Sequence, residues 1–431
     1  MFQKIFLKHV MKYIEMVNII FRPKGRYNSK VNNFIQFQRK FNYIKLKTII
    51  AVGFRIDTKN NYYTGQAAMI DLFIDIAQNN KFQVIPVALN YKIGSDTKVG
   101  TTSILRIIDY FRIFSIIFYR LVTHPGSILY FSPVSNKIGF YRDAAVVYFA
   151  KLVGCKVFMQ QFGCRFESFY ETLSPLMQKI VRRTYMKATI ITTEGMLAKD
   201  QLSILNLDNK ILIVNNGLPE KSIIEIKEGK EIDLEKPFIL LYLNNMIESK
   251  GYLDVLKATD ILVNKYHKNI KTIFAGKFMS VIDDKIFKST EEAKKYFFEF
   301  IKIHNLLNNI EYYPGLFGVE KAKIFIACNV FLLPTYYVFE GQPTVILEAL
   351  AYGALPIVTR HSLIPEMINE DCGKFVDKQS PDSIVRGVLD LLNDHQEYHR
   401  LSSNCIIRFQ ENYTIKSYSE KIIKIIKLKF N

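Results

Sequence analysis

Two glutamates, Glu340 and Glu348, lie on either side of the point where a loop is expected to enter a helix. The N-terminus of a helix has free N–H groups and a positive dipole end, so it is a ready site for an anion. Carboxylates accept hydrogen bonds from neutral hydroxyl groups. The pair therefore predicts a site for a ligand that joins phosphate to hydroxyl groups, as a sugar nucleotide does. Without their surroundings, the same residues would be an ordinary loop charge and an exposed helix charge.

The surrounding residues predict a strand–loop–helix unit that positions this pair. A buried strand at Val330–Leu333 is followed by a loop, and a helix at Thr344–Tyr352 leads to a further strand. Pro343 suits the first turn of that helix, where its missing N–H costs nothing. Gly341 allows the backbone to come close to a ligand, and Gly353 suits the left-handed position that ends a helix.

Short apolar runs recur along the chain and alternate with segments of helical periodicity. Most are β-branched and almost unbroken in apolar character, which is typical of strands buried on both faces. Their alternation with helices predicts parallel strand–helix–strand units. We therefore predict an α/β protein with two doubly wound, Rossmann-like domains facing a central cleft, with ligands beyond the carboxyl ends of the strands. The expected strands are Thr48–Val52, Phe82–Ala88, Ile128–Phe131, Lys156–Met159, Thr189–Thr192, Ile211–Val214, Phe238–Leu243, Lys271–Ala275, Ile310–Tyr313, Val330–Leu333, Pro356–Thr359 and Lys374–Val376.

A charged segment that ends at a proline separates the two sets of strands and suits a linker. The C-terminal helix has two interpretations: it returns to pack on the first domain, which we favour, or its lysines and isoleucines place it on a membrane. The predicted organisation is a basic amphipathic N-terminal extension at 1–47, a first Rossmann-like domain at 48–220, a linker at 221–237, a second Rossmann-like domain at 238–410 and a C-terminal helix at 411–431.

The net charge of +18 is concentrated at the beginning of the chain, where residues 1–50 hold eleven Lys or Arg and one acid. A basic surface of this kind suggests an anionic partner such as phosphate, nucleic acid or an anionic membrane face. A lysine-rich composition with solvated charges explains the excess equally well. Residues 1–21 interleave charges with apolar residues, unlike a signal peptide. No run of eighteen apolar residues exists that would span a membrane.

The stretch Glu340-Gly-Gln-Pro-Thr-Val-Ile-Leu-Glu-Ala-Leu-Ala-Tyr-Gly resembles the E-x7-E signature of family 4 retaining glycosyltransferases, which have the GT-B fold. The match is informative because the strand–loop–helix context that the signature needs is also predicted. It implies that the first domain is the acceptor side and that the second domain binds the donor. By this resemblance Glu340 contacts the donor sugar and Glu348 binds the nucleotide ribose. The loop residues implied to hold sugar and phosphate are Gly341, Gln342, Pro343 and Thr344.

Two segments of the second half resemble the same family on the donor side. Lys250 and Gly251 match a segment in which a basic pair clamps the diphosphate, but the usual arginine is Asn245 here. Asparagine can donate a hydrogen bond but carries no charge. Lys250 is therefore the implied phosphate ligand, and Asn245 is the weaker candidate. Gly315 falls where the family contacts the base, although a structural turn explains it equally well.

The first half carries looser matches. Gly65 precedes a helix near the place where the family holds the diphosphate and the acceptor; a plain helix cap is the alternative. Gly163 and Arg165 belong to a segment that resembles the family's H-x-H-G run, and a surface role for Arg165 is the simpler interpretation. Both histidine positions differ, as Gln160 and Phe162. The missing second histidine leaves open whether activity is impaired or other side chains contact the acceptor.

The resemblance implies a hexosyltransferase-type enzyme that moves a sugar, with retention, from a UDP- or GDP-linked donor to a glycan or polyprenyl-diphosphate-linked acceptor. Capsule or exopolysaccharide synthesis would follow. Negative charge builds on the leaving diphosphate, and a helix N-terminus with Lys250 would stabilise it. No metal cofactor is expected, because the chain has no D-x-D motif and its five scattered cysteines give no zinc pattern. The expected location is the cytoplasm, with peripheral attachment to the inner face of the plasma membrane as an option.

Two other functions are considered. An inactive GT-B relative that binds sugar nucleotide or membrane without transfer would explain Asn245 and Phe162. A nucleic-acid-binding protein would explain the net charge, but no recognition motif is present and the basic excess lies mostly outside the candidate site. We therefore expect no nucleic-acid partner.

Overall fold

The structure is a computed structural model that describes residues 47–57, 64–90, 104–218, 226–281 and 284–430. The predicted N-terminal extension at 1–47 lies outside these ranges except for Lys47, as does the first part of the predicted linker. Residues 47–431 form one compact unit.

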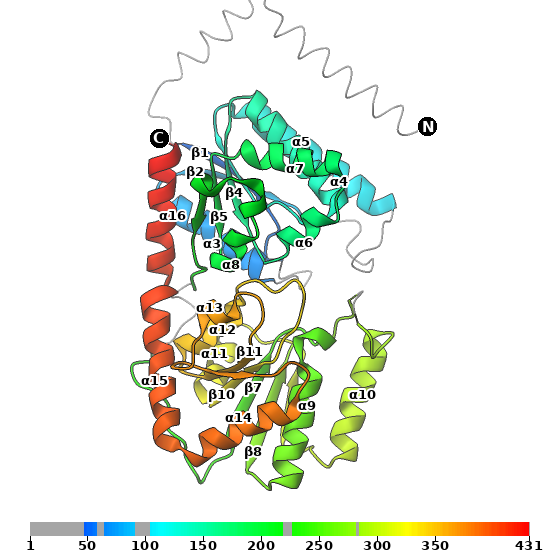
Figure 1. The fold of residues 1–431 in the computed structure, drawn as a ribbon, viewed down its shortest axis with the longest axis vertical. Helices are drawn as coiled ribbons and strands as arrows, with labels where there is room; N and C mark the ends of the chain where they lie inside the picture. Colours follow the sequence, from blue (N-terminus) through cyan, green and yellow to red (C-terminus); the bar gives the residue numbers. More distant parts are fainter. Residues whose placement is uncertain (1–46, 58–63, 91–103, 219–225, 282–283, 431) are drawn as a thin grey trace, which may run out of the picture. The chain divides into compact units, whose positions relative to one another are not determined.

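Two parallel six-stranded sheets organise this unit (Figure 1). Their strand orders are β2-β1-β3-β4-β5-β6 and β12-β11-β10-β7-β8-β9. All twelve predicted strands are confirmed, with ends that differ by at most two residues. The α/β, doubly wound fold class is confirmed as well. The strands are β1 Thr48–Gly53, β2 Gln83–Ala88, β3 Ile128–Phe131, β4 Lys156–Gln161, β5 Ile190–Thr193, β6 Ile211–Ile213, β7 Phe238–Leu243, β8 Ile270–Ala275, β9 Ile310–Tyr313, β10 Val330–Leu333, β11 Leu355–Thr359 and β12 Lys374–Val376.

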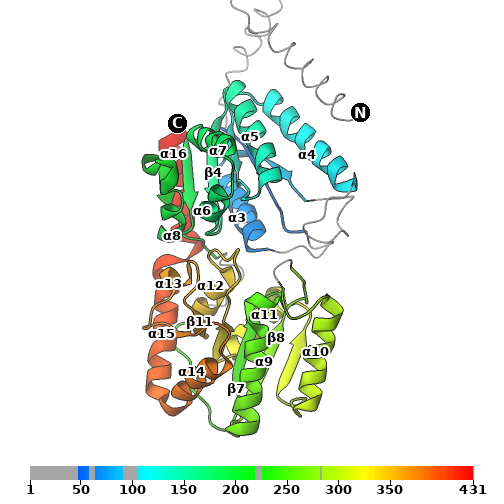
Figure 2. The same ribbon diagram turned by 45° about the vertical axis from the view of Figure 1, so that its right-hand side comes forward.

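Helices connect the strands of each sheet and cover its faces (Figures 1 and 2). Side chains at several helix starts accept hydrogen bonds from free N–H groups, as Thr64 does for α3 and Ser174 for α7. In the described ranges every helix is too short or too polar to cross a bilayer. The helices are α3 Gly65–Asn79, α4 Ile104–Thr123, α5 Lys137–Leu152, α6 Phe166–Glu171, α7 Pro175–Met186, α8 Met196–Asp200, α9 Tyr252–Asp260, α10 Thr290–Ile303, α11 Gly318–Ala327, α12 Thr344–Ala351, α13 Ile364–Met367, α14 Pro381–Asn393, α15 His395–Asn412 and α16 Ile415–Phe430.

The unit predicted around the two glutamates is present, with one difference. Gly353 has φ +62°, which confirms the left-handed position expected after α12. Pro343 is the N-cap residue of α12 and not part of its first turn, because its ψ of 114° is extended. Since the strands of each sheet are parallel, the loops that follow them leave from one edge. The loop that holds Glu340 leaves the second sheet at this carboxyl edge.

The last helix of the chain belongs to the core of the first sheet. Ile422 and Ile426 of α16 lie in the apolar cluster that also holds residues of β1, α3 and β4. The ring of Phe430 lies 5.7 Å from that of Phe158, centroid to centroid. Helix α15 packs on α12 of the second sheet, and the chain runs from α15 directly into α16 (Figure 1). The two ends of this helical run are thus anchored on different sheets.

The packing of α16 predicts a difference between two alanine variants of that helix. Ile422→Ala should lower the free energy of unfolding by about 2–4 kcal/mol, since a buried side chain is removed and a cavity is left. Leu428 is 69% exposed on the same helix, so Leu428→Ala should change stability by less than about 0.5 kcal/mol. Urea denaturation followed by circular dichroism measures both. Equal unfolding midpoints for the two variants would contradict the packing.

Candidate active site at the carboxyl edges of the two sheets

Lys250 and Glu340 form a buried ion pair at the carboxyl edge of the second sheet. Their Nζ and Oε2 atoms are 2.6 Å apart, and the two residues are only 7% and 6% exposed. The hydroxyl of Thr335 donates to the same carboxylate oxygen at 3.0 Å. The ammonium group lies 4.5 Å from the centre of the Tyr337 ring, which adds a cation–π contact. The structure thus brings together the two residues predicted from sequence to act on sugar and phosphate.

Close backbone packing holds the turn that carries Lys250. This residue ends a short 3-10 helix, Glu248–Lys250, just after β7. Gly251 has φ +82°, and a Cβ there would lie 2.5 Å from the carbonyl oxygen of Pro334 at the end of β10. Only glycine lets the two loops approach so closely. The carboxylate of Glu248 accepts N–H groups from residues 285–287, which fixes the other side of the turn.

The N-terminus of α12 faces the N-terminus of α3, a helix of the first domain. A Cβ placed on Gly65, the first residue of α3, would lie 3.5 Å from Oγ1 of Thr344, the first residue of α12. Each helix start is the positive end of a helix dipole. Pro343, at the N-cap of α12, has no side-chain group that could occupy the free N–H groups. Two such ends at one place suit a group with more than one negative charge.

Glu348, the second glutamate of the predicted signature, is buried and forms an ion pair with Lys321 of α11. Burial raises the pKa of its carboxyl group, and the nearby Lys321 ammonium opposes this shift. Glu348 is therefore not an exposed helix charge. Lys321 was not predicted, because nothing in the helical pattern around it indicates a partner on another helix.

Three turns of the first domain meet the loop that holds Glu340. The N–H of Gly163 donates to the carboxylate of Glu194 at 2.9 Å, and the side-chain amide of Asn216 donates to it at 2.7 Å. The backbone N–H of Asn216 donates to Oε1 of Gln342 at 2.6 Å. The Gln342 side chain thus contacts the first domain. Glu194 was not predicted, although its position directly after the buried strand β5 is a signal that could have found it.

The predicted acceptor-side arginine lies against the same loop. The guanidinium carbon of Arg165 lies 4.2 Å from the centre of the Phe339 ring, and Phe339 directly precedes Glu340 in the chain. Stacking of this kind is a typical arginine contact. Arg165 and the turn at Gly163 therefore lie beside the loop that holds Glu340.

Other predicted positions take different places. Asn245 donates its N–H to the side chain of Asn244, and its carbonyl accepts from the Tyr242 hydroxyl. Gly315 lies in the loop between β9 and α11, where a Cβ would meet the ring of Phe317 at 3.1 Å. Among the described residues, neither is hydrogen-bonded to the Lys250–Glu340 pair.

The two positions at which histidines were expected carry core residues. Phe162 packs against the apolar cluster beneath α16. The side-chain oxygen of Gln160 accepts the hydroxyl of Tyr130 at 2.5 Å, in a buried contact. Both side chains contribute to the interior of the first domain.

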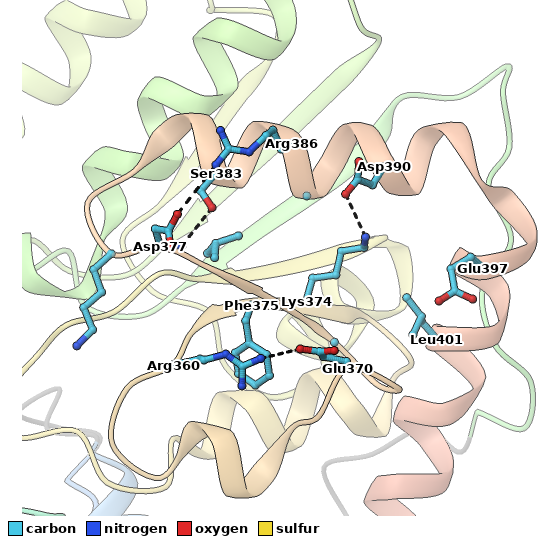
Figure 3. A pocket seen from close by; sticks show the side chains of 14 residues that line it. Arg360, Glu370, Lys374, Phe375, Asp377, Ser383, Arg386, Asp390, Glu397 and Leu401 are labelled. Carbon is cyan, nitrogen blue, oxygen red and sulfur yellow. Dashed lines mark hydrogen bonds and ion pairs between the residues drawn. The ribbon is translucent and has the colours of Figure 1, made fainter.

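A pocket of about 630 Å³ lies elsewhere, between the edge strand β12 and helices α14 and α15 (Figure 3). None of the predicted site residues lines it. Several of its charged side chains pair with one another, as Arg360 does with Glu370 at 2.7 Å and Lys374 with Asp390 at 3.3 Å. Because these charges are already compensated and the loops of the candidate site lie elsewhere, we do not assign this pocket to the active site.

Comparison with known proteins places this geometry in context. Residues 223–407 match the model of the family described as "Glycosyl transferases group 1". An uncharacterized glycosyltransferase of Methanocaldococcus jannaschii is 23% identical over 221 residues, which cover 51% of this chain and 53% of that protein. The chain thus spans about half the length of the curated relative that it matches.

Solved structures share the fold of nearly the whole chain. HepE of Anabaena, solved in complex with UDP, has 10% identity and a TM-score of 0.62, covering 88% of this chain and 99% of that chain. Sucrose-phosphate synthase of Thermosynechococcus elongatus has 13% identity and a TM-score of 0.64, and the likeness covers 89% of this chain and 99% of that chain. A glycosyltransferase of Rickettsia africae has 13% identity and a TM-score of 0.66, covering 90% and 99%. The solved structures confirm the GT-B fold, and the family match over residues 223–407 relates that part of the chain to group 1 glycosyl transferases.

The buried ion pair predicts strong coupling between its two members. Removing one member leaves the other charge buried and unpaired, so Lys250→Met and Glu340→Gln should each lower the free energy of unfolding by about 3–5 kcal/mol. The double variant should lose clearly less than the sum of these two effects. Urea denaturation of the wild type, the two single variants and the double variant gives the coupling free energy between Lys250 and Glu340.

An exposed pair on α10, Lys295 and Glu299, is the matched control. The same cycle on that pair should give less than about 1 kcal/mol, because water screens exposed charges. Additive losses for Lys250→Met and Glu340→Gln would contradict the buried pair.

Proposed function

We propose that the protein is a retaining glycosyltransferase that moves a sugar from a nucleotide-diphosphate sugar to a glycan or lipid-linked acceptor in cell-surface polysaccharide synthesis. The observation that carries this proposal is the meeting of the α3 and α12 N-termini beside the Lys250–Glu340 pair. A diphosphate suits two helix N-termini and an ammonium group, and sugar hydroxyls suit a carboxylate. HepE of Anabaena was solved with UDP and with UDP-glucose, which supports a UDP-linked donor here; a GDP-linked donor is the alternative.

The ion pair suggests how the donor is received. Without a ligand, Lys250 and Glu340 compensate each other's charge in a buried place. A bound donor would offer phosphate oxygens to Lys250 and sugar hydroxyls to Glu340, so each residue exchanges one partner for another. Each charged group keeps polar partners in this exchange, phosphate oxygens for Lys250 and hydroxyl donors for Glu340, which avoids the large cost of a buried ion without partners.

In the proposed transfer step, negative charge develops on the leaving diphosphate. The bond between the anomeric carbon and the diphosphate oxygen breaks, and a bond from that carbon to the acceptor oxygen forms on the same face. The acceptor's proton passes to the leaving diphosphate, and no protein nucleophile is required. Lys250 and the two helix N-termini stabilise the negative charge that develops on the leaving group. We expect this transfer to need no metal ion.

Glu348 is proposed to bind the ribose of the donor. Glu348 lies about one turn from the start of α12, so the ribose would lie further along the helix than the phosphates. Lys321 keeps this carboxylate compensated in the unliganded protein. Arg165 and the turn at Gly163 are proposed to line the acceptor side.

The donor assignment predicts different effects for two substitutions. UDP at one hundred times its dissociation constant should stabilise the wild-type protein by about 2.7 kcal/mol, which a thermal-shift assay detects. Lys250→Met should weaken this shift, because it removes a phosphate contact. Glu340→Ala should keep the UDP shift but reduce sugar transfer by about a hundredfold or more, because the glutamate contacts the sugar.

A panel of labelled UDP- and GDP-sugars with membrane extract measures transfer. Wild-type turnover in Glu340→Ala would refute the donor assignment. Nucleotide binding by the wild-type protein with neither transfer nor hydrolysis would favour the alternative, an inactive GT-B relative, which the changes at Asn245 and Phe162 also suit.

The acceptor is proposed to lie at an anionic membrane surface on the cytoplasmic side. Helix α4 exposes large apolar residues on one face, among them Ile108, Phe111, Tyr119 and Val122. Helix α5, which packs beside α4, adds exposed Tyr141, Tyr148 and Leu152 together with lysines. Exposed apolar groups interleaved with basic side chains are typical of surfaces that lie on lipid headgroups.

This surface predicts association with vesicles that contain anionic lipid. Phe111→Glu combined with Tyr119→Glu should reduce flotation with phosphatidylglycerol-containing liposomes at least several-fold, since a charge opposes entry into the headgroup layer. Leu307→Glu is the control, because Leu307 is an exposed apolar residue of the second domain. Removal of residues 1–47 should also weaken flotation. If neither the Phe111→Glu, Tyr119→Glu double variant nor the removal of residues 1–47 changed flotation, the membrane proposal would be refuted.

A further inference from the structure

Glu194 is a buried carboxylate at the junction between the acceptor-side turn and the donor loop. It directly follows β5 and is 4% exposed. One oxygen accepts the N–H of Gly163, and the other accepts the side-chain amide of Asn216. Gly163 has φ +75°, so its turn has a left-handed backbone that points this N–H at the carboxylate.

The donor loop closes over the same carboxylate. A Cβ placed on Gly341 would lie 2.6 Å from Oε2 of Glu194 and 3.1 Å from Cα of Gly163. Any side chain at position 341 would therefore push the loop away from Glu194. Asn216, which holds one oxygen of Glu194, also donates its backbone N–H to Gln342. Glu194 thus contacts the acceptor-side turn and lies directly against the donor loop.

No lysine, arginine or histidine in the described part of the chain forms an ion pair with Glu194. The charged and titratable groups that face it are Glu340 before α12, Glu366 of α13 beside Gly195, Cys164 after β4 and Tyr418 of α16. Burial raises the pKa of Glu194 to about 7. Hydrogen bonds from the N–H groups of Gly163 and Gln342 and from the Asn216 side chain lower this pKa, and the negative charge of Glu340 raises it further.

We propose that Glu194 is a positioning residue of the transfer site, which fixes the acceptor-side turn at Gly163 to the donor loop at Gly341 and Gln342. The proposal rests on the proposed function and extends it from the donor to the geometry between donor and acceptor. A retaining transfer needs the acceptor oxygen on the same face as the leaving group, so small displacements between these two segments are costly. Glu194 is the side chain that the two segments share.

The position of Glu194 also makes this junction depend on pH. We call the junction closed when Glu194 is buried between the Gly163 turn and the donor loop, as it is in this structure. An ordinary glutamate pKa is 4.5, and the pKa of Glu194 in the closed junction is about 7. Ionisation is therefore less favourable in the closed junction than in water. Opening that exposes Glu194 becomes easier as the pH rises from about 4.5 to about 7, and the effect levels off above that range. Between pH 6 and pH 8 this linkage predicts about a tenfold increase in the opening equilibrium.

Hydrogen exchange tests this directly and needs no donor. After correction for the intrinsic exchange rate, the amides of Gly163 and Gln342 in the full-length wild-type protein should be about tenfold less protected at pH 8 than at pH 6. Glu194→Gln should abolish this difference, and Glu194→Asp should retain it. Glu167→Gln, at an exposed glutamate of α6, is the control and should behave like the wild type. Wild-type protection that is equal at the two pH values would overturn the proposal.

Kinetics provide the second readout. With the UDP-sugar that the wild type turns over, KM for the donor should rise between pH 6 and pH 8, and Glu194→Gln should flatten this profile. Glu194→Asp should restore the slope. A merely structural role would lower the folding midpoint of Glu194→Gln without changing the pH profile, and an unchanged profile would overturn the proposal. Failure of the wild type to bind UDP or GDP, with the exchange result as expected, would count against the proposed function and not against the junction.

Discussion

The site depends on how buried carboxylates are compensated where two parallel sheets end. Lys250 and Glu340 come from loops that follow neighbouring strands, β7 and β10, so their meeting is a direct result of parallel topology. Removing both charges from water is costly, and the pair, the Thr335 hydroxyl and the Tyr337 ring together offset that cost. A ligand that replaces the pair must therefore bring its own anion and its own hydroxyl groups. The proposed sugar nucleotide donor meets this requirement, because it carries both phosphates and sugar hydroxyls.

The junction between the two domains is also held by contacts to free backbone groups. The carboxylate of Glu366 accepts the N–H groups of Met196 at 2.6 Å and Leu197 at 2.8 Å, at the start of α8. The side chain of Gln342 in the second domain accepts the N–H of Asn216 in the first domain. In each case an acceptor side chain of the second domain meets a backbone donor of the first domain. Such contacts are directional, so they define a separation without the stability of a large apolar interface.

Local signals predicted most of the fold and named some of the residues that the structure brings together at the candidate site. Strands such as Ile128–Phe131 are apolar on both faces, so their boundaries can be read from composition. The turn at Gly353 follows from the need for a left-handed residue after a helix. The pairing of Glu348 with Lys321 was not predictable, because it joins two helices whose relative position only the assembled sheet determines. Glu194 directly follows a buried strand, which is a signal for a site, but the loop that covers it comes from the other domain and could not be placed from sequence.

The carboxylates of Glu340, Glu348 and Glu194 have different kinds of partners, and we infer different roles for them from this difference. Glu340 and Glu348 each have a lysine partner, so we expect each ion pair to persist until a bound ligand provides other hydrogen-bond partners. Within the described ranges the hydrogen-bond donors to Glu194 are N–H groups, and burial raises its pKa to about 7. Lysine partners suit residues that exchange contacts with a donor, because the ammonium group is released for the phosphates at the same time. N–H donors suit a residue that joins two loops, because these donors belong to the backbone of those loops. The residue that holds the junction is thus also the one that titrates near neutrality, and the closed arrangement becomes easier to open as its proton is lost.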